Sequence, residues 1–245
     1  MQLEPRVDVK VWDLPIRLFH WILTALFVFQ VVTGMLGGGL MQWHLYSGYM
    51  VLALLIFRVS WGFAGSTHAR FASFVTGPRA TVRFARRLLS EEAVPQLGHN
   101  PLGGWMVLAL LATFALQAVT GLFAFDGVAA AGPLARLVSP ETSNRLSEVH
   151  DWNVNVLLLL VMLHIAGVLF HALAKAESLV KPMFTGIKRV PASLLQERRE
   201  ARRDAPLRRA ASREPSAARS ASSWLALALF AAAAAVVALL ATVFR

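Results

Sequence analysis

Residues 148–173 read EVHDWNVNVLLLLVMLHIAGVLFHAL, a stretch that combines an apolar run of membrane length with three histidines. A helix needs about 20 predominantly apolar residues to cross the hydrocarbon core of a bilayer, so this stretch predicts a transmembrane helix. Its histidines, His150, His164 and His171, are costly to bury in lipid unless each has a partner. The stretch therefore predicts both a fold class and a binding function.

Four other apolar runs have a similar length, and they lie near residues 16–36, 44–63, 103–125 and 224–244. The chain of 245 residues is 56% hydrophobic and 16% charged, which is too apolar for an ordinary soluble domain. Runs this long also exclude a transmembrane β-barrel, whose strands are about half as long and alternate in polarity. We predict an all-α polytopic membrane protein, a four-helix bundle with a fifth, C-terminal transmembrane helix.

The positive charge is distributed unevenly along the chain. Segment 64–102 carries five arginines and segment 175–222 carries twelve lysines or arginines, whereas the loop 37–43 is uncharged. The positive-inside rule places both basic segments on the cytoplasmic side of a bacterial inner membrane, with the N-terminus cytoplasmic and the C-terminus periplasmic. Because topology accounts for the net charge of +10, we expect a lipid bilayer as partner and no nucleic acid.

Composition divides the chain into three parts. We expect a membrane domain at 1–185, a basic disordered cytoplasmic linker at 186–222, rich in Arg, Ala, Ser and Pro, and a C-terminal transmembrane helix at 223–245. Residues 81–89, TVRFARRLL, predict an amphipathic helix on the cytoplasmic surface, and 126–149 predicts a short periplasmic helix. We find no strong internal repeat.

The depths of the histidines in the predicted spans form two pairs. His20 and His164 lie toward the cytoplasmic face, and His44 and His150 lie toward the periplasmic face. The fourteen residues from 150 to 164 rise about 21 Å and make nearly four helical turns, so these two side chains point the same way in opposite leaflets. Two haems, each held between two histidines, fit this arrangement. Two imidazole ligands leave iron no open position, which favours electron transfer over oxygen binding.

Other interpretations of these residues remain. A single intramembrane histidine hydrogen-bonds to a neighbouring helix more often than it binds a metal. Zinc and copper also accept imidazole, but the sequence places no carboxylate or thiol at either depth to complete a compact site. The chain has no cysteine, which excludes thiolate-held clusters and covalent haem attachment. His68 and His99 fall in a basic loop and are interpreted as surface residues.

Further candidate residues lie near the cytoplasmic histidine pair. Arg17 and Arg58 sit at the cytoplasmic ends of the first two spans, where a guanidinium suits either a haem propionate or a lipid phosphate. His171 lies about 10 Å deeper toward the cytoplasm than His164, on nearly the same face. It is placed to hydrogen-bond a quinone carbonyl, or it is a plain interfacial histidine.

At these residues the chain resembles the bacterial cytochrome b561 and nickel–iron hydrogenase b-type cytochrome family. The matching stretches are VWDLPIRLFHW at 11–21, HLYSGYMVLALLIFRVSWG at 44–62, ARFASFVTGP at 69–78, GHNPLGGW at 98–105 and HDWNVNVLLLLVMLH at 150–164. The resemblance implies a four-helix membrane cytochrome that holds two b haems with His20, His44, His150 and His164. Residues 191–245 are not part of the family core.

The resemblance also implies a role in the respiratory chain. We expect an electron-transfer subunit of an oxidoreductase rather than a stand-alone catalyst, which relays electrons between the membrane quinone and a periplasmic c-type cytochrome or hydrogenase. A superoxide oxidase branch of the family has a histidine at the position of His171, so a superoxide:quinone oxidoreductase is an alternative on the same scaffold. A haem-free membrane anchor or transporter is an alternative of a different class.

Overall fold

Five membrane-length helices dominate the computed structural model, which describes residues 5–89, 96–125, 127, 130–196 and 221–243. They are α1 (Leu14–Leu36), α2 (Met41–Ala64), α4 (Pro101–Phe123), α5 (Pro140–Ala174) and α8 (Ser223–Val243). The shorter elements are β1 (Arg6–Lys10), η1 (Gly38–Leu40), η2 (Phe71–Ser73), α3 (Pro78–Leu89), η3 (Ala135–Leu137), α6 (Val180–Thr185) and β2 (Ile187–Pro191). The predicted all-α polytopic membrane fold with a fifth C-terminal helix is confirmed.

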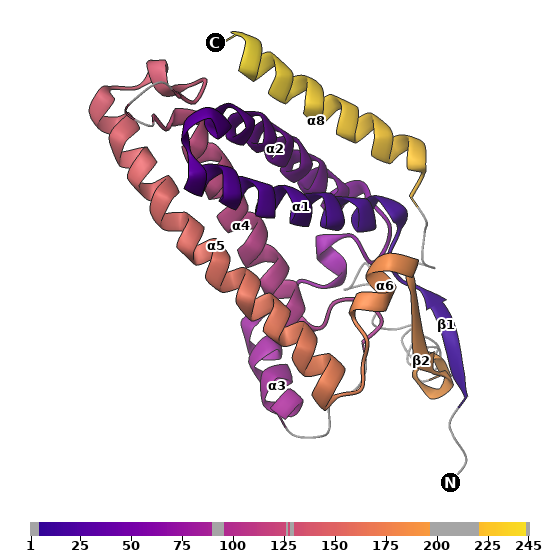
Figure 1. Cartoon of the computed structure of the whole chain (residues 1–245). Helices are drawn as coiled ribbons and strands as arrows, with labels where there is room; N and C mark the ends of the chain where they lie inside the picture. Colours follow the sequence, from indigo (N-terminus) through magenta and orange to yellow (C-terminus); the bar gives the residue numbers. More distant parts are fainter. Residues whose placement is uncertain (1–4, 90–95, 126, 128–129, 197–220, 244–245) are drawn as a thin grey trace.

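Two antiparallel helix pairs make up the bundle. α1 packs along α2, α4 packs along α5, and contacts between α2 and α4 join the pairs. α8 lies along α2 on the side of the bundle away from α5 (Figure 1). Its buried residues Ala226 and Ala233 pack in one cluster with Phe57 and Trp61 of α2, where small side chains allow close approach of the two helices. α2 is therefore the central helix, with neighbours on three sides.

Three of the long helices begin with the same local device. A polar side chain before the first turn accepts a hydrogen bond from a backbone N–H two or three residues into the helix, and a proline follows the cap. Asp13 caps α1, Asn100 caps α4 and Ser139 caps α5. These caps stop each helix from extending backward, so they fix the depth of every residue that follows.

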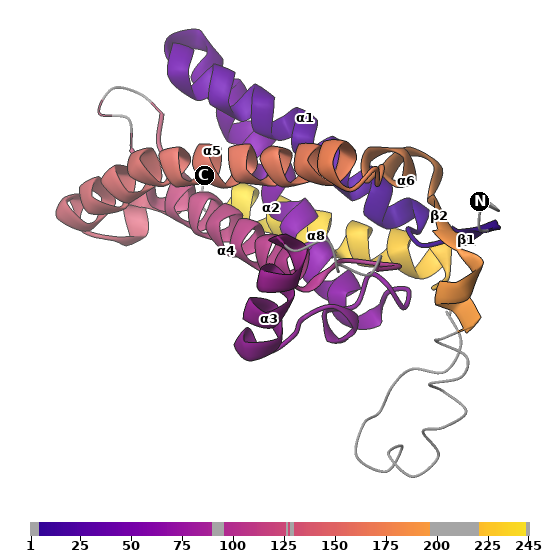
Figure 2. The same ribbon diagram turned by 90° about the horizontal axis from the view of Figure 1, so that it is seen from below.

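A small β-ribbon closes one end of the bundle. β1 pairs antiparallel with β2, with Arg6 opposite Pro191 and Lys10 opposite Ile187 (Figure 1). We call this end, which also holds α3 and α6, the ribbon end, and the end that holds η1 the turn end. Seen from below, α4 and α5 run side by side between the two ends (Figure 2).

The ribbon changes the expected start of the linker. Val190 of β2 is fully buried, and the Lys188 ammonium forms an ion pair of 2.6 Å with Glu177 and donates to the Gln96 carbonyl. The predicted disordered segment 186–222 therefore begins with an ordered strand, because alternate residues of that strand bury against the bundle. Residues 197–220 of the predicted linker lie outside the described residues.

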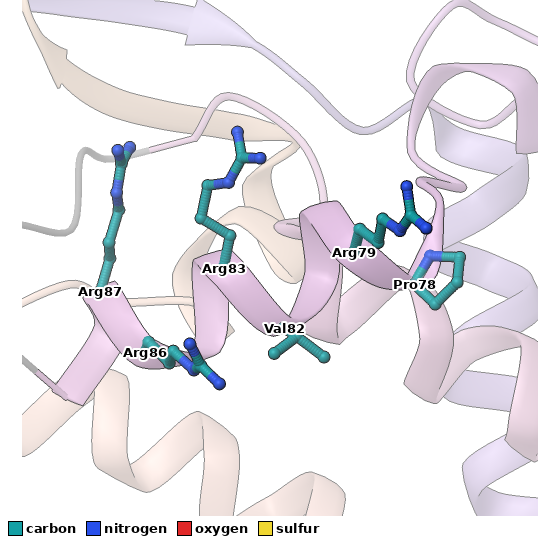
Figure 3. Close-up of a pocket in the computed structure, with 6 residues that line it drawn as sticks. All are labelled: Pro78, Arg79, Val82, Arg83, Arg86 and Arg87. Carbon is teal, nitrogen blue, oxygen red and sulfur yellow. The ribbon is translucent and has the colours of Figure 1, made fainter.

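Two segments outside the spans also differ in detail from expectation. The helix predicted in loop 126–149 is the start of α5, whose 35 residues span about 52 Å and exceed the thickness of the hydrocarbon core. The amphipathic helix predicted at 81–89 is present as α3 and begins earlier, at Pro78. Its arginines Arg79, Arg83 and Arg87 extend to one side of the helix (Figure 3).

Candidate functional site

His44 of α2 and His150 of α5 face each other near the turn end. Their ring centroids lie 6.1 Å apart. Two imidazoles that share one metal from opposite sides, with each nitrogen about 2.0–2.1 Å from the metal, hold their ring centres about 6 to 6.5 Å apart. The separation therefore suits a single metal ion between the two rings.

His44 is held in one orientation by residues of α1. Its Nδ1 donates to the Gln30 carbonyl at 3.1 Å, and Thr33 Oγ1 lies 3.3 Å from the same nitrogen. The Gln30 side-chain amide in turn donates to the His44 carbonyl at 2.9 Å. A histidine whose Nδ1–H is engaged in this way presents Nε2 as a free ligand atom, which is the usual support of a metal-binding imidazole.

His150 has the same support from α4. Its Nδ1 donates to the Gln117 carbonyl at 2.9 Å, Thr120 Oγ1 lies 3.3 Å from that nitrogen, and the Gln117 amide donates to the His150 carbonyl. Asn153, one turn after His150, donates to the Gln117 side chain at 2.7 Å. The two histidines are therefore positioned by equivalent hydrogen bonds from different helices.

This equivalence reveals an internal repeat that the sequence analysis missed. Residues 30–34 read QVVTG and residues 117–121 read QAVTG. A Cβ atom on Gly34 would lie 3.1 Å from the His44 ring, and one on Gly121 would lie 2.9 Å from the His150 ring. In each helix pair, the Gln and Thr thus orient one imidazole and the Gly leaves room for it. The five-residue match was the signal in the sequence, and its meaning depends on which histidine each copy faces.

The second predicted pair meets near the ribbon end. The ring centroids of His20 in α1 and His164 in α5 lie 6.4 Å apart, which again suits a shared metal. The support differs from that of the first pair, because His20 Nδ1 is buried with no hydrogen-bond partner among the described residues. The structure thus brings together both pairs expected from depth, and their role as haem ligands stays a prediction.

Each of these centres offers two protein ligands. The described residues contain no group of three or more His, Asp or Glu side chains that could hold a metal ion by themselves. A haem needs no more than two, because the porphyrin supplies the other four nitrogens. The donor sets therefore fit haem iron better than a bare zinc or copper ion.

The ribbon end also gathers nitrogen atoms that have no partner. Buried side-chain nitrogens without a hydrogen bond, among the described residues, belong to Arg17, His20, Arg58 and His99. Arg58 is 3% exposed and stacks over the Phe71 ring at 5.0 Å. Buried donors of this kind are unfavourable unless an acceptor satisfies them, so the cluster fits an anionic group at this end of the bundle.

His99 is not the surface residue that its place in a basic loop suggested. Its ring packs against Trp12 and Phe74, with ring centroids 4.7 and 4.6 Å away. This burial, together with the charge of Arg58, lowers the pKa of His99 to about 3. Leu97 is the buried residue of segment 96–100, and His99 itself is half-buried because Trp12 and Phe74 pack against its ring. His68 is half-buried beside Gly98 of the same segment.

His171 lies about two helical turns beyond His164 in α5 and is 8% exposed. Its Nδ1 donates to the Gly167 carbonyl at 2.9 Å, and its Nε2 accepts from the Asn100 side chain at 3.2 Å. Asn100 also caps α4 through its Oδ1. A single residue thus links the start of α4 to His171, a connection that sequence reasoning did not foresee.

Comparisons with known proteins agree on one family. The family model described as prokaryotic cytochrome b561 matches residues 11–186, which ends before α8. A probable Ni/Fe-hydrogenase B-type cytochrome subunit of Azotobacter chroococcum is 29% identical over 220 residues, covering 76% of this chain and 90% of that protein. Proteins of the same name from Rhizobium leguminosarum and Rhodobacter capsulatus are 25% and 24% identical, with 74% and 75% of this chain and 89% and 82% of those proteins covered. No solved structure matches the chain.

Proposed function

The chain belongs to the prokaryotic cytochrome b561 family, and from that premise we propose that it holds two b haems and relays electrons across the membrane. One haem lies between His44 and His150, and we call it the outer haem. The other lies between His20 and His164, and we call it the inner haem. The observation that carries the proposal is the pair of ring separations, 6.1 and 6.4 Å, at two depths of one bundle.

When bound, each haem supplies one-electron chemistry with no open iron position for a substrate. The work of the protein is then to hold and orient the ligands. Gln30 and Gln117 fix the tautomer of the outer imidazoles and keep each Nε2 free of its own proton. Arg17 and Arg58 supply donors for the propionates of the inner haem, which would satisfy nitrogens that otherwise stay unpartnered.

The orientation that we propose follows the charge distribution. The ribbon end carries the arginines of α3 and the basic residues around β2, so it faces the cytoplasm, and the turn end faces the periplasm. The N-terminus is then cytoplasmic and the C-terminus periplasmic, in a bacterial inner membrane. The outer haem would meet a periplasmic redox partner. Relatives named hydrogenase cytochrome subunits support a hydrogenase in that place, with a c-type cytochrome as the other candidate.

We place the quinone at the ribbon end, beside His171. The Asn100 amide has two hydrogens: one engages His171, and the other can donate to a quinone carbonyl. A quinol hydroxyl that replaces the Asn100 amide would donate to His171 Nε2. In both the quinone and the quinol complex, His171 Nδ1 would still donate to the Gly167 carbonyl. The His171 ring would therefore keep its orientation.

The haem content and the electron donor of the purified protein test this function. We expect close to two haems per chain, both reducible, and reduction by hydrogen only when a nickel–iron hydrogenase is added. A haem content near zero from cells with ample haem would reject the proposal and favour an anchor or transporter. Rapid reduction by superoxide alone, with no partner protein, would favour the superoxide:quinone oxidoreductase.

We expect the substitution His171→Leu to raise the KM for quinone about tenfold, because the Asn100 amide loses the partner that holds it in position to donate to the quinone carbonyl. Haem content should stay at two, since His171 belongs to neither ring pair. Steady-state quinone reduction and the visible spectrum measure the two effects. Phe170→Leu, at the neighbouring position of α5, is the matched control. An unchanged KM in His171→Leu would place the quinone elsewhere.

A further inference from the structure

The environment of His99 is unusual for a histidine outside the two ring pairs. The residue stands in a loop, yet its Nδ1 is buried and has no hydrogen-bond partner among the described residues. The rings of Trp12 and Phe74 both pack against the imidazole, at centroid distances of 4.7 and 4.6 Å, and a rotation of the imidazole would disturb these contacts. In the tautomer that carries its proton on Nδ1, His99 has a buried donor without an acceptor, which indicates that another group accepts from it.

Arg58, at the same end of the bundle, also has a buried terminal nitrogen without a hydrogen-bond partner among the described residues. Its guanidinium stacks on Phe71, and the Phe71 ring contacts Phe74, which packs against His99. Asp13, the carboxylate at the start of α1, already accepts from the Ile16 backbone and from the Trp61 indole at 3.1 Å. An anion with two oxygens, able to accept from both Arg58 and His99, would satisfy both donors. A carboxylate has this chemistry.

The position of His99 near His164 indicates which carboxylate accepts from these donors. His99 stands at the ribbon end, with the inner ring pair: its neighbour Asn100 donates to His171, which lies seven residues beyond His164 in α5, and its ring contacts Trp12, which directly precedes the cap of α1. A haem between His20 and His164 would bring two propionates into this part of the bundle. We propose that His99 is a positioning residue of the inner haem, which donates from Nδ1 to a propionate that Arg58 also contacts. This inference rests on the proposed function.

The assignment gives segment 96–100 a role. His99 would contact the inner haem, while its neighbour Asn100 caps α4 and donates to His171. Two adjacent side chains would thus join the propionate end of the inner haem to the proposed quinone position. Loss of the donor at residue 99 leaves a propionate more negative, which stabilises oxidised iron and lowers the reduction potential of that haem alone.

The test compares His99→Phe and His99→Gln in the purified holoprotein. Phenylalanine keeps a ring against Trp12 and Phe74 and removes the donor, and glutamine restores a donor. We expect His99→Phe to lower the equilibrium constant for reduction of the inner haem about threefold to tenfold and to speed its loss to excess apomyoglobin about tenfold. His99→Gln should recover much of both effects. The inner haem is assigned as the titration wave that is absent from His20→Ala.

The outer haem of each variant is the internal control, and Phe74→Leu, which disturbs the stacking and leaves the donor, is the packing control. The proposal is wrong if His99→Phe titrates and loses haem like the wild type, or if Phe74→Leu reproduces its effects. If His99→Phe does not fold, His99→Met supplies the donor-free measurement. A wild-type protein with fewer than two haems would instead overturn the proposed function.

Discussion

Replacing His44 with alanine is expected to lower the haem content of the purified protein from two per chain to one. His44 and His150 face each other at 6.1 Å, so removal of one ring leaves the outer iron with a single protein ligand. His20 and His164 are untouched, so the inner haem stays. Electron transfer from a periplasmic partner to quinone should fall to background, because the first of the two centres is missing. Pyridine-haemochrome analysis and a redox titration with one remaining wave measure the loss.

His68→Ala is the matched control for this experiment, since His68 is half-buried in the loop after α2 and lies in neither ring pair. It should keep both haems. An His44→Ala protein that still carries two haems with an unchanged spectrum would contradict the ligand assignment. A wild type and variant that both lack haem would point to the anchor or transporter instead.

The periodicity of a helix explains why these pairs could be predicted at all. Residues fourteen apart in one long helix keep nearly the same direction, and the order of the spans gives each histidine a depth. Those two rules need no knowledge of packing, and they bring together the residues that the structure places 6.1 and 6.4 Å apart. The membrane makes depth predictable, because it aligns the helices along one axis.

Features that depend on contacts between segments far apart in the sequence could not be predicted from the sequence. The β-ribbon pairs residues 6–10 with residues 187–191, and no local sequence pattern predicts that these two segments pair. The burial of His99 depends on Trp12 and Phe74, which come from two other segments. The QVVTG and QAVTG copies are visible as letters, but each acquires its role only when α1 meets α2 and α4 meets α5. Local sequence rules describe helices and depth, whereas these features require the packed structure.

The repeat leads to a second large effect, at a residue that is not a ligand. We expect Gly121→Val to remove most of the outer haem, because a Cβ atom at this position would already lie 2.9 Å from the His150 ring. The added methyl groups would push the imidazole away from the Gln117 carbonyl and off the axis toward His44. Overpacking of this kind costs about 1–3 kcal/mol, which corresponds to haem binding weaker by about fivefold to 150-fold.

Haem content and the rate of haem loss to apomyoglobin check this prediction, and Ala115→Val is the matched control because it adds bulk to an exposed position of the same helix. Gly34→Val should also weaken binding of the outer haem, because a Cβ atom on Gly34 would lie 3.1 Å from the His44 ring. Two glycines on different helices that produce the same loss would show that both copies of the motif support one centre. If Gly121→Val binds outer haem as tightly as Ala115→Val does, the imidazole of His150 has room to move. The close fit of the helices would then not be what holds the ring in place.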